Sequence, residues 1–137
     1  MRIFQSTLAL LLLLGWMGCT SNSSSTAQAQ IFEDLEPTAF QAKYQEAGGQ
    51  ILDVRTPPEV AEGVIEGAMV INIQDSDFSA RIDALDKTKA VFVYCKAGGR
   101  SARASGMLEK LGFTEVYNLD GGITAWKAAG LPVATNN

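Results

Sequence analysis

Residues 90–101, AVFVYCKAGGRS, join an uninterrupted apolar run to a short polar segment with a glycine pair. A run that is apolar on both faces is typical of a central strand in a covered sheet, so residues 90–94 predict such a strand. Beyond the polar segment, one helical stripe ends at Gly112 and contains Ala104, Met107, Leu108 and Leu111. A buried strand, a tight loop and a helix in this order indicate an α/β fold.

The rest of the chain from Ile31 onward alternates in the same way. Pro37 suits the first position of a helix that ends before Gly48 and Gly49. Buried strands are predicted at residues 51–54, 69–73 and 116–119, and short helices at residues 78–85 and 124–129. The pattern predicts one α/β domain over residues 31–135, with a parallel sheet and crossover helices.

Composition narrows the possible functions. The chain has 137 residues, of which 47% are hydrophobic and 19% charged, which suits one compact domain. A formal net charge of −4 gives no basic surface for nucleic acid, so no nucleic-acid partner is expected. The chain has no His, which excludes Cys-His catalytic pairs and His-ligated metal sites. Since two cysteines are also too few for a Cys-only zinc site, neither a metal nor a cofactor is expected.

The loop that begins at Cys95 is the candidate site. Its thiol lies at the carboxyl end of the predicted central strand, the edge of an α/β sheet where ligands bind. Gly98 and Gly99 allow the backbone N–H groups to curl inward, and Ser101 is a candidate helix N-cap. Together with the positive end of the helix dipole, this arrangement is suited to an anion, including a thiolate.

Positive charge is concentrated around this thiol. Lys96, Arg100 and Arg103 lie within nine residues of one another in an otherwise acidic chain. Nearby cations and a helix N-terminus lower the pKa of a cysteine, so we expect a reactive thiolate and a small anionic substrate. The alternative is that Cys95 is a small buried hydrophobic residue and that the three cations are ordinary surface charges.

The first residues resemble the leader of an exported bacterial protein. Arg2 precedes an apolar run, residues 8–14, that is shorter than the roughly 20 residues of a membrane-spanning helix. Gly18 and Cys19 resemble a lipobox, in which the leader is removed before the Cys and the Cys is lipidated. Residues 1–18 are therefore expected to be a lipoprotein signal peptide, and Cys19 the lipid attachment site.

Residues 19–30 contain no charge and little apolar surface, so we expect them to be a flexible tether. Thr20 follows the candidate lipidated Cys and favours sorting to the outer membrane in proteins of that kind. The expected location is the periplasm, with membrane contact only through the lipid anchor. Ala27-Gln28-Ala29 offers an alternative cut that would release a soluble exported protein.

Four short motifs follow one another between Leu35 and Val133. They are residues 52–57 (LDVRTP), Glu62-Gly63 with Ile65, Gly67 and Ala68, the Cys95 loop, and residues 119–122 (LDGG) with Trp126. In this order they resemble the rhodanese-like sulfurtransferases. The resemblance implies a single domain with a five-stranded parallel sheet flanked by helices.

The resemblance also implies a role for each site residue. Cys95 would carry a persulfide, held by the backbone amides of Lys96, Ala97, Gly98, Gly99, Arg100 and Ser101. Lys96 and Arg100 would bind the charge of the donor. Asp53 and Arg55 resemble positions that brace the loop and its rim, although a structural ion pair is an equally good interpretation of these two residues.

The implied reaction moves sulfur in two steps. The Cys95 thiolate would take the outer sulfur of thiosulfate or another sulfane donor, and cyanide or a thiol would then accept it. No general base is needed, which agrees with the absence of His. Cys95 is the only thiol of the expected mature domain, so the acceptor would come from outside the chain.

The chain departs from the family pattern at a few positions. Val64 stands where the family usually has His, Glu66 where Pro is frequent, and Lys96 where Arg is more frequent. A Lys cannot make the planar bidentate contact of an Arg, so these positions bear on the preferred substrate and on the rate.

Two other functions compete with sulfur transfer. A cysteine phosphatase or arsenate reductase uses a Cys-x5-Arg loop, whereas the segment from Cys95 to Arg100 is one residue shorter. A non-catalytic module of the same fold would use the cationic loop to bind an anion or a partner protein, but binding alone needs no thiol.

Overall fold

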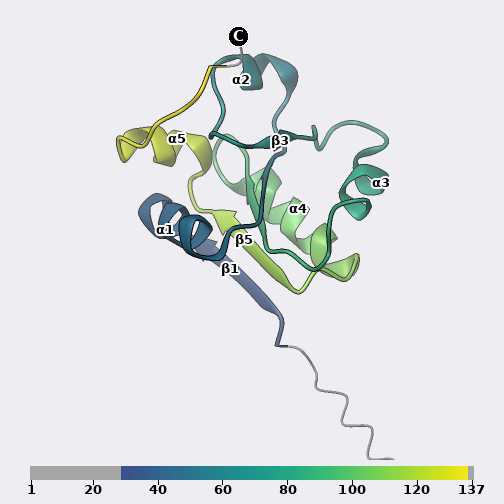
Figure 1. Cartoon of the computed structure of the whole chain (residues 1–137). Coiled ribbons are helices and arrows are strands. Elements are labelled where there is room, and N and C mark those ends of the chain that lie inside the picture. Colours follow the sequence, from purple (N-terminus) through teal and green to yellow (C-terminus); the bar gives the residue numbers. More distant parts are fainter. Residues whose placement is uncertain (1–28, 136–137) are drawn as a thin grey trace, which may run out of the picture.

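The computed structural model describes residues 29–135, which form a five-stranded parallel sheet flanked by helices, as predicted (Figure 1). The strands are β1 (Ile31–Leu35), β2 (Gln50–Asp53), β3 (Met69–Val70), β4 (Val91–Tyr94) and β5 (Glu115–Leu119). The helices are α1 (Pro37–Ala47), α2 (Pro57–Ala61), α3 (Phe78–Asp83), α4 (Gly99–Lys110) and α5 (Gly122–Ala128). The expected leader and Cys19 lie outside the described residues, and no described helix is long and apolar enough to cross a membrane.

The strand order is β1-β5-β4-β2-β3, and every neighbouring pair is parallel. The central strand β4 is buried along its whole length, which agrees with its continuous apolar sequence. Because all strands run in the same direction, the residues that follow β2, β4 and β5 meet at one edge of the sheet. The Cys95 loop lies at this edge.

Each face of the sheet has its own core, and the alternation of β4 separates them. Val91, Val93 and Cys95 belong to the core that α3 and α4 cover. Phe92 and Tyr94 belong to the core beneath α1 and α5, where Phe92 contacts the rings of Phe40, Tyr44 and Tyr117. The side chain of Cys95 is therefore directed to the α4 side of the sheet.

Three elements differ from the sequence prediction. β1 was not predicted, because it is an edge strand with Glu33 and Asp34 exposed and little apolar alternation. α2 was not predicted, since five residues are too few for a helical period. β3 covers only Met69–Val70, although Ile71 and Ile73 still donate backbone hydrogen bonds to the end of β2 and the residue after it.

Candidate active site

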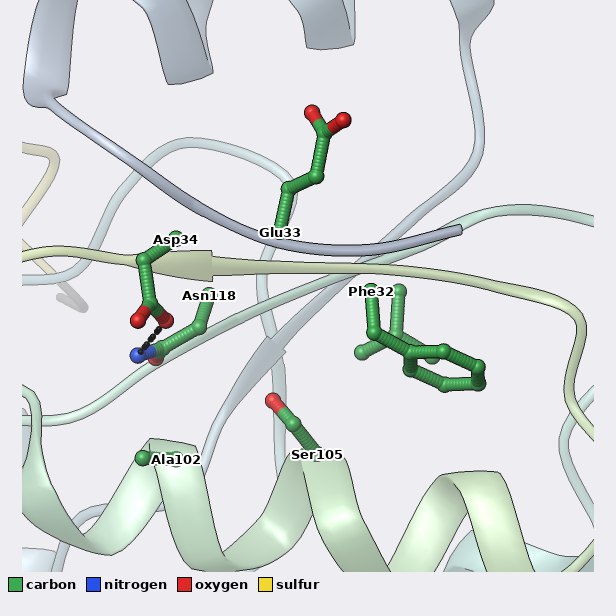
Figure 2. A pocket seen from close by; sticks show the side chains of 7 residues that line it. Phe32, Glu33, Asp34, Ala102, Ser105 and Asn118 are labelled. Atoms are coloured by element: carbon green, nitrogen blue, oxygen red, sulfur yellow. Dashed lines mark hydrogen bonds between the residues drawn. The ribbon is translucent and has the colours of Figure 1, made fainter. Parts of the chain in front are cut away.

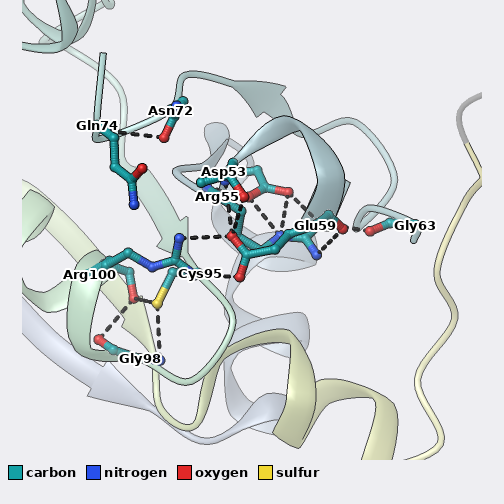
Figure 3. Close-up of polar contacts among 11 residues, drawn as sticks. Asp53, Arg55, Glu59, Gly63, Asn72, Gln74, Cys95, Gly98 and Arg100 are labelled. Carbon is teal, nitrogen blue, oxygen red and sulfur yellow. Dashed lines mark hydrogen bonds and ion pairs between the residues drawn. The ribbon is translucent and has the colours of Figure 1, made fainter. Parts of the chain in front are cut away.

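Cys95 follows β4 directly and is almost completely buried, with 1% of its surface exposed. Its Sγ accepts a hydrogen bond from the backbone N–H of Gly98 at 3.1 Å and from the hydroxyl of Ser101 at 3.4 Å (Figure 3). The first four residues of the loop turn the chain from the strand into α4. The thiol consequently faces hydrogen-bond donors at the start of a helix.

The start of α4 corrects one sequence prediction. The N-cap is Gly98, with φ of 101°, and not Ser101, which lies in the first turn of the helix. Gly98 needs this left-handed conformation, and a Cβ there would also approach the backbone N of Gly121 to 3.3 Å. Gly99 has no positive φ and open space around it, so only one glycine of the pair is required by backbone geometry.

Ser101 gains a different role from this shift. Its hydroxyl is completely buried, lies 3.0 Å from the carbonyl oxygen of Gly98 and reaches the Cys95 sulfur. Burial of Cys95 raises the pKa of its thiol, but hydrogen bonds from the Ser101 hydroxyl and from the backbone N–H groups of Ser101, Gly98 and Ala97 outweigh it. The net result is a pKa below the usual thiol value, which favours the thiolate.

Arg100 is held by a residue that the sequence analysis did not single out. Its guanidinium makes a bidentate ion pair with Glu59 of α2, at 2.6 and 2.8 Å (Figure 3). Hydrogen bonds from Arg100 are the main cause that lowers the pKa of Glu59 to about 2. Arg100 in turn has a raised pKa, chiefly through Glu59 and with a smaller contribution from the charge of Cys95.

Glu59 had a recognisable signal in the sequence. Thr56 and Glu59 form a capping box at the start of α2, in which the Glu59 carboxylate accepts from the backbone N–H of Thr56 at 3.1 Å. A Ser or Thr followed three residues later by Glu is the usual mark of such a box. The pairing with Arg100 could not be read in this way, because 41 residues separate the two side chains.

Asp53 and Arg55 form a buried ion pair behind the loop. Arg55 Nη2 lies 2.6 Å from Asp53 Oδ2, and the two side chains are 1% and 0% exposed. Arg55 also donates to the backbone carbonyls of Glu59 and Gly63, at 2.8 and 2.7 Å. Arg55 thus ties the end of β2 to the middle of α2 and to Gly63 beyond the end of that helix, and these contacts suit a structural brace.

The LDGG motif, residues 119–122, leads into α5, whose first residues pack against the start of the Cys95 loop. Gly122 begins α5 with φ of 60°, and a Cβ there would lie 2.5 Å from the carbonyl group of Lys96. Ile123 and Thr124 donate their backbone N–H groups to the carbonyls of Cys95 and Lys96, at 2.9 and 3.1 Å. A residue larger than Gly at position 122 would push against the Cys95 loop itself.

The remaining predicted residues surround this arrangement. Lys96 and Ala97 are exposed at the start of the loop. Val64, in the position of the usual family His, is buried and pairs through its backbone with Ala134. Among residues 29–135, no group of three or more His, Cys, Asp or Glu side chains could hold a metal ion.

The model of the rhodanese-like domain family matches residues 36–129, more than half of the chain. The chain belongs to this family. The match extends over α1 to α5 and includes the four motifs that surround Cys95.

Two relatives and one solved structure are similar to this chain over three quarters or more of their own length. It is 38% identical to a thiosulfate sulfurtransferase of Pseudomonas fluorescens, covering 70% of this chain and 85% of the relative. It is 37% identical to a sulfurtransferase of Allochromatium vinosum, covering 61% and 76%. The solved rhodanese-related protein of Thermoplasma volcanium superposes with a TM-score of 0.67 at 31% identity, covering 76% of this chain and 99% of that one.

Proposed function

We propose that this protein is a sulfurtransferase that carries sulfane sulfur as a persulfide on Cys95. The observation that carries the proposal is the convergence of the Gly98 N–H and the Ser101 hydroxyl on a buried sulfur at the start of α4. Such donors stabilise a charged sulfur without any protonated base. The similarity to thiosulfate sulfurtransferases supports the same reaction class.

The first half-reaction loads the protein. The Cys95 thiolate attacks the outer sulfur of thiosulfate, an S–S bond forms to Cys95, and sulfite leaves with the electron pair of the bond that breaks. The charge then lies on the outer sulfur of the persulfide, where the amides from Lys96 to Ser101 would bind it. Arg100, already ordered by Glu59, and the exposed Lys96 attract the anionic donor.

The second half-reaction regenerates the thiolate. Cyanide or an external thiolate attacks the outer sulfur, takes it, and leaves the electron pair of the persulfide bond on Cys95. The acceptor comes from outside the chain, because the sequence has two cysteines and Cys19 is the expected lipid attachment site. A thiol acceptor leaves as its own persulfide, which a further reductant or enzyme must consume.

Phosphate transfer fits the same residues less well. A cysteine phosphatase needs an acid to protonate the leaving alcohol, whereas sulfite leaves without a proton at neutral pH. Glu59 is the carboxylate joined to the loop, and with a pKa of about 2 it stays ionised. Asp53 is committed to Arg55 away from solvent. We therefore place the phosphatase or arsenate reductase second, and a non-catalytic binding module third.

The test uses the full chain carrying Cys19→Ser, in which Cys95 is the single thiol. We expect thiosulfate:cyanide sulfur transfer and, after thiosulfate treatment alone, an increase in intact mass by one sulfur atom. Both should vanish when Cys95→Ser is added, while Ser79→Ala, an exposed hydroxyl on α3, should change neither.

If the folded, reduced protein neither gained a sulfur atom nor transferred sulfur from thiosulfate to cyanide, the proposal would be wrong. Hydrolysis of an aryl phosphate that depends on Cys95 would then favour the phosphatase. The absence of both activities would favour the binding module.

We further propose that the protein is exported and lipidated at Cys19. The support is the sequence alone: the apolar run 8–14, the Gly18-Cys19 pair and the uncharged segment 19–30. In a bacterial host the full chain should then incorporate labelled palmitate and fractionate with outer membranes. Cys19→Ser should lose the label, whereas unlabelled, soluble periplasmic protein ending its leader at Ala29 would support the alternative cut.

A further inference from the structure

A cavity lies on the flank of α4, away from the Cys95 thiol, between this helix and strands β1 and β5 (Figure 2). It measures about 230 Å³ and is lined by Phe32, Glu33, Asp34, Ala102, Ser105, Val116 and Asn118. The parallel register pairs Phe32 with Val116 and Asp34 with Asn118, so each pair faces α4 together. Glu33 alternates to the other face of the sheet and contributes its backbone here (Figure 2).

Asn118 is the unusual group in this cavity. It is 5% exposed, and its Nδ2 donates to Asp34 Oδ1 at 2.8 Å. Its Oδ1 is buried and has no hydrogen-bond partner among the described residues. The orientation of the amide follows from the carboxylate, since only the NH2 side can donate to it. A buried carbonyl oxygen without a hydrogen-bond donor costs folding free energy. A ligand that brings an N–H donor into the cavity would remove this cost.

The other polar groups of the cavity are acceptors as well. The Ser105 hydroxyl, which points from α4 toward the sheet, donates to the backbone carbonyl of Ser101 at 3.0 Å and keeps its lone pairs (Figure 2). Asp34 is exposed at the mouth and brings a carboxylate. The Ser105 hydroxyl proton and one of the two N–H donors of Asn118 are already used within the protein, and no lining residue is a cation.

We propose that this cavity binds a primary ammonium group at the end of a short alkyl chain. An ammonium group has three N–H donors and no acceptor, which matches the acceptors of Asn118, Ser105 and Asp34. Phe32, Val116 and Ala102 provide an apolar wall for the methylene groups. The cavity is smaller than the roughly 300 Å³ of common small-molecule pockets, so it fits a group of a few atoms. No cation lines the cavity and the Asp34 side chain brings a carboxylate to it, so a cation is favoured over an anion.

The test is a titration of the full ¹⁵N-labelled chain with Cys19→Ser, using n-butylammonium and following the Asn118 side-chain amide and the Ser105 backbone amide by NMR. We expect saturable shifts in the millimolar range, as suits a ligand of so few atoms. n-Butanol has the alkyl chain without the charge, and tetramethylammonium has the charge without N–H donors. Neither should saturate the site, and equal shifts with tetramethylammonium would overturn the proposal.

The source of the ammonium group is a separate arm of the same experiment. A free amine and the side chain of a lysine present the same chemistry, so Nα-acetyl-lysine amide and a lysine placed centrally in an extended peptide are titrated beside n-butylammonium. Tighter binding of the peptide would identify a protein lysine as the ligand. Tighter binding of the small amine would identify a free amine. Saturable binding of either supports the proposal, and no saturable shift with any of them contradicts it.

Matched variants remove the acceptors one at a time. Asn118→Leu and Ser105→Ala should abolish or weaken the shifts, and Asp34→Asn should weaken binding several-fold at low salt. Glu46→Gln removes an exposed carboxylate from α1 and should leave binding unchanged. Because Asp34 is exposed, Asp34→Asn keeps the test valid even if a core variant fails to fold. Shifts that persist in all three cavity variants would overturn the site. The readout involves no sulfur chemistry, so it is independent of the proposed reaction.

Discussion

Two arginine–carboxylate pairs stand beside the Cys95 loop, and they differ in depth. Asp53 and Arg55 are 0% and 1% exposed, and Arg55 also donates to two backbone carbonyls. Glu59 and Arg100 are 20% and 27% exposed, and their bidentate contact joins α2 to the start of α4. The same chemistry is thus used once inside the molecule and once at its surface.

The difference in depth separates two roles. A buried ion pair contributes little net stability, but removing one partner leaves an uncompensated charge in the interior. The Glu59–Arg100 pair is partly exposed, so solvent weakens the attraction within it and an anionic substrate can compete for its arginine. We therefore expect the inner pair to determine stability and the outer pair to determine activity.

The largest expected effect is loss of stability in Asp53→Asn. Arg55 would keep its charge with no carboxylate beside it, which costs roughly 3–5 kcal/mol of the free energy of unfolding. Urea denaturation followed by circular dichroism measures the change. Arg81→Gln breaks an exposed pair with Asp75 and should cost less than about 1 kcal/mol.

The double variant Asp53→Leu/Arg55→Met sharpens the result. It removes both charges and should recover part of the loss, although the carbonyls of Glu59 and Gly63 then lack their donors. If Asp53→Asn were no less stable than Arg81→Gln, the buried pair would not be the brace described here.

The second effect is loss of activity in Arg100→Gln. The variant removes the cation that faces both the donor and the thiolate, and we expect at least about a tenfold fall in kcat/KM for thiosulfate, since a charged hydrogen bond contributes roughly 1.5 kcal/mol or more. Stability should change by less than about 1 kcal/mol. Arg100→Lys, which keeps the charge, should recover part of the activity. Unchanged kcat/KM in Arg100→Gln would reverse the assignment of the two pairs.

A smaller effect concerns the pH dependence of stability. The pKa of Glu59 is lowered from 4.5 to about 2, so its contribution is complete above pH 4.5 and is lost as the pH falls toward 2. Glu59→Gln should therefore be less stable than the parent at pH 7, and the difference should shrink at pH 3. Urea midpoints at the two pH values measure this, with Glu46→Gln as the control. A constant difference across this range would contradict the pairing.

The smallest effect concerns Ser101. Ser101→Ala removes one hydrogen bond to the Cys95 thiolate, so the pKa of the thiol should rise and alkylation by iodoacetamide at pH 7 should slow. The pH profile of the alkylation rate measures the shift. Arg100→Gln should move this profile less, because the hydrogen bonds that lower the pKa of the thiol come from Ser101, Gly98 and Ala97. A larger shift in Arg100→Gln would make Arg100 a thiolate stabiliser.

The sequence predicts the centre of this molecule better than its rim. β4 and α4 follow from an apolar run and a helical stripe, which are strong local patterns. β1 lacks such a pattern because one of its edges faces solvent. Ser101 was misplaced as an N-cap because Gly98, in a left-handed conformation, starts the helix earlier.

Contacts between distant segments were not visible in the sequence. Glu59 and Arg100 are 41 residues apart, and Asp34 and Asn118 are 84 apart. The first contact depends on where α2 packs, and the second on the register of β1 with β5. The spacing of residues along the chain predicts neither the packing position of α2 nor the register of β1.

The position of β1 determines which way the sulfur site faces. Ile31 begins β1 at the edge of the sheet formed by the amino ends of the strands, and Cys95 follows the parallel strand β4 at the edge formed by their carboxyl ends. Five strand residues, at about 3.3 Å each, separate the two edges by roughly 16 Å. Under the proposed attachment through Cys19, the tether of residues 19–30 would join the domain at the end opposite to the Cys95 thiol. The reactive thiol would then look outward, where diffusing acceptors can reach it without passing between protein and membrane.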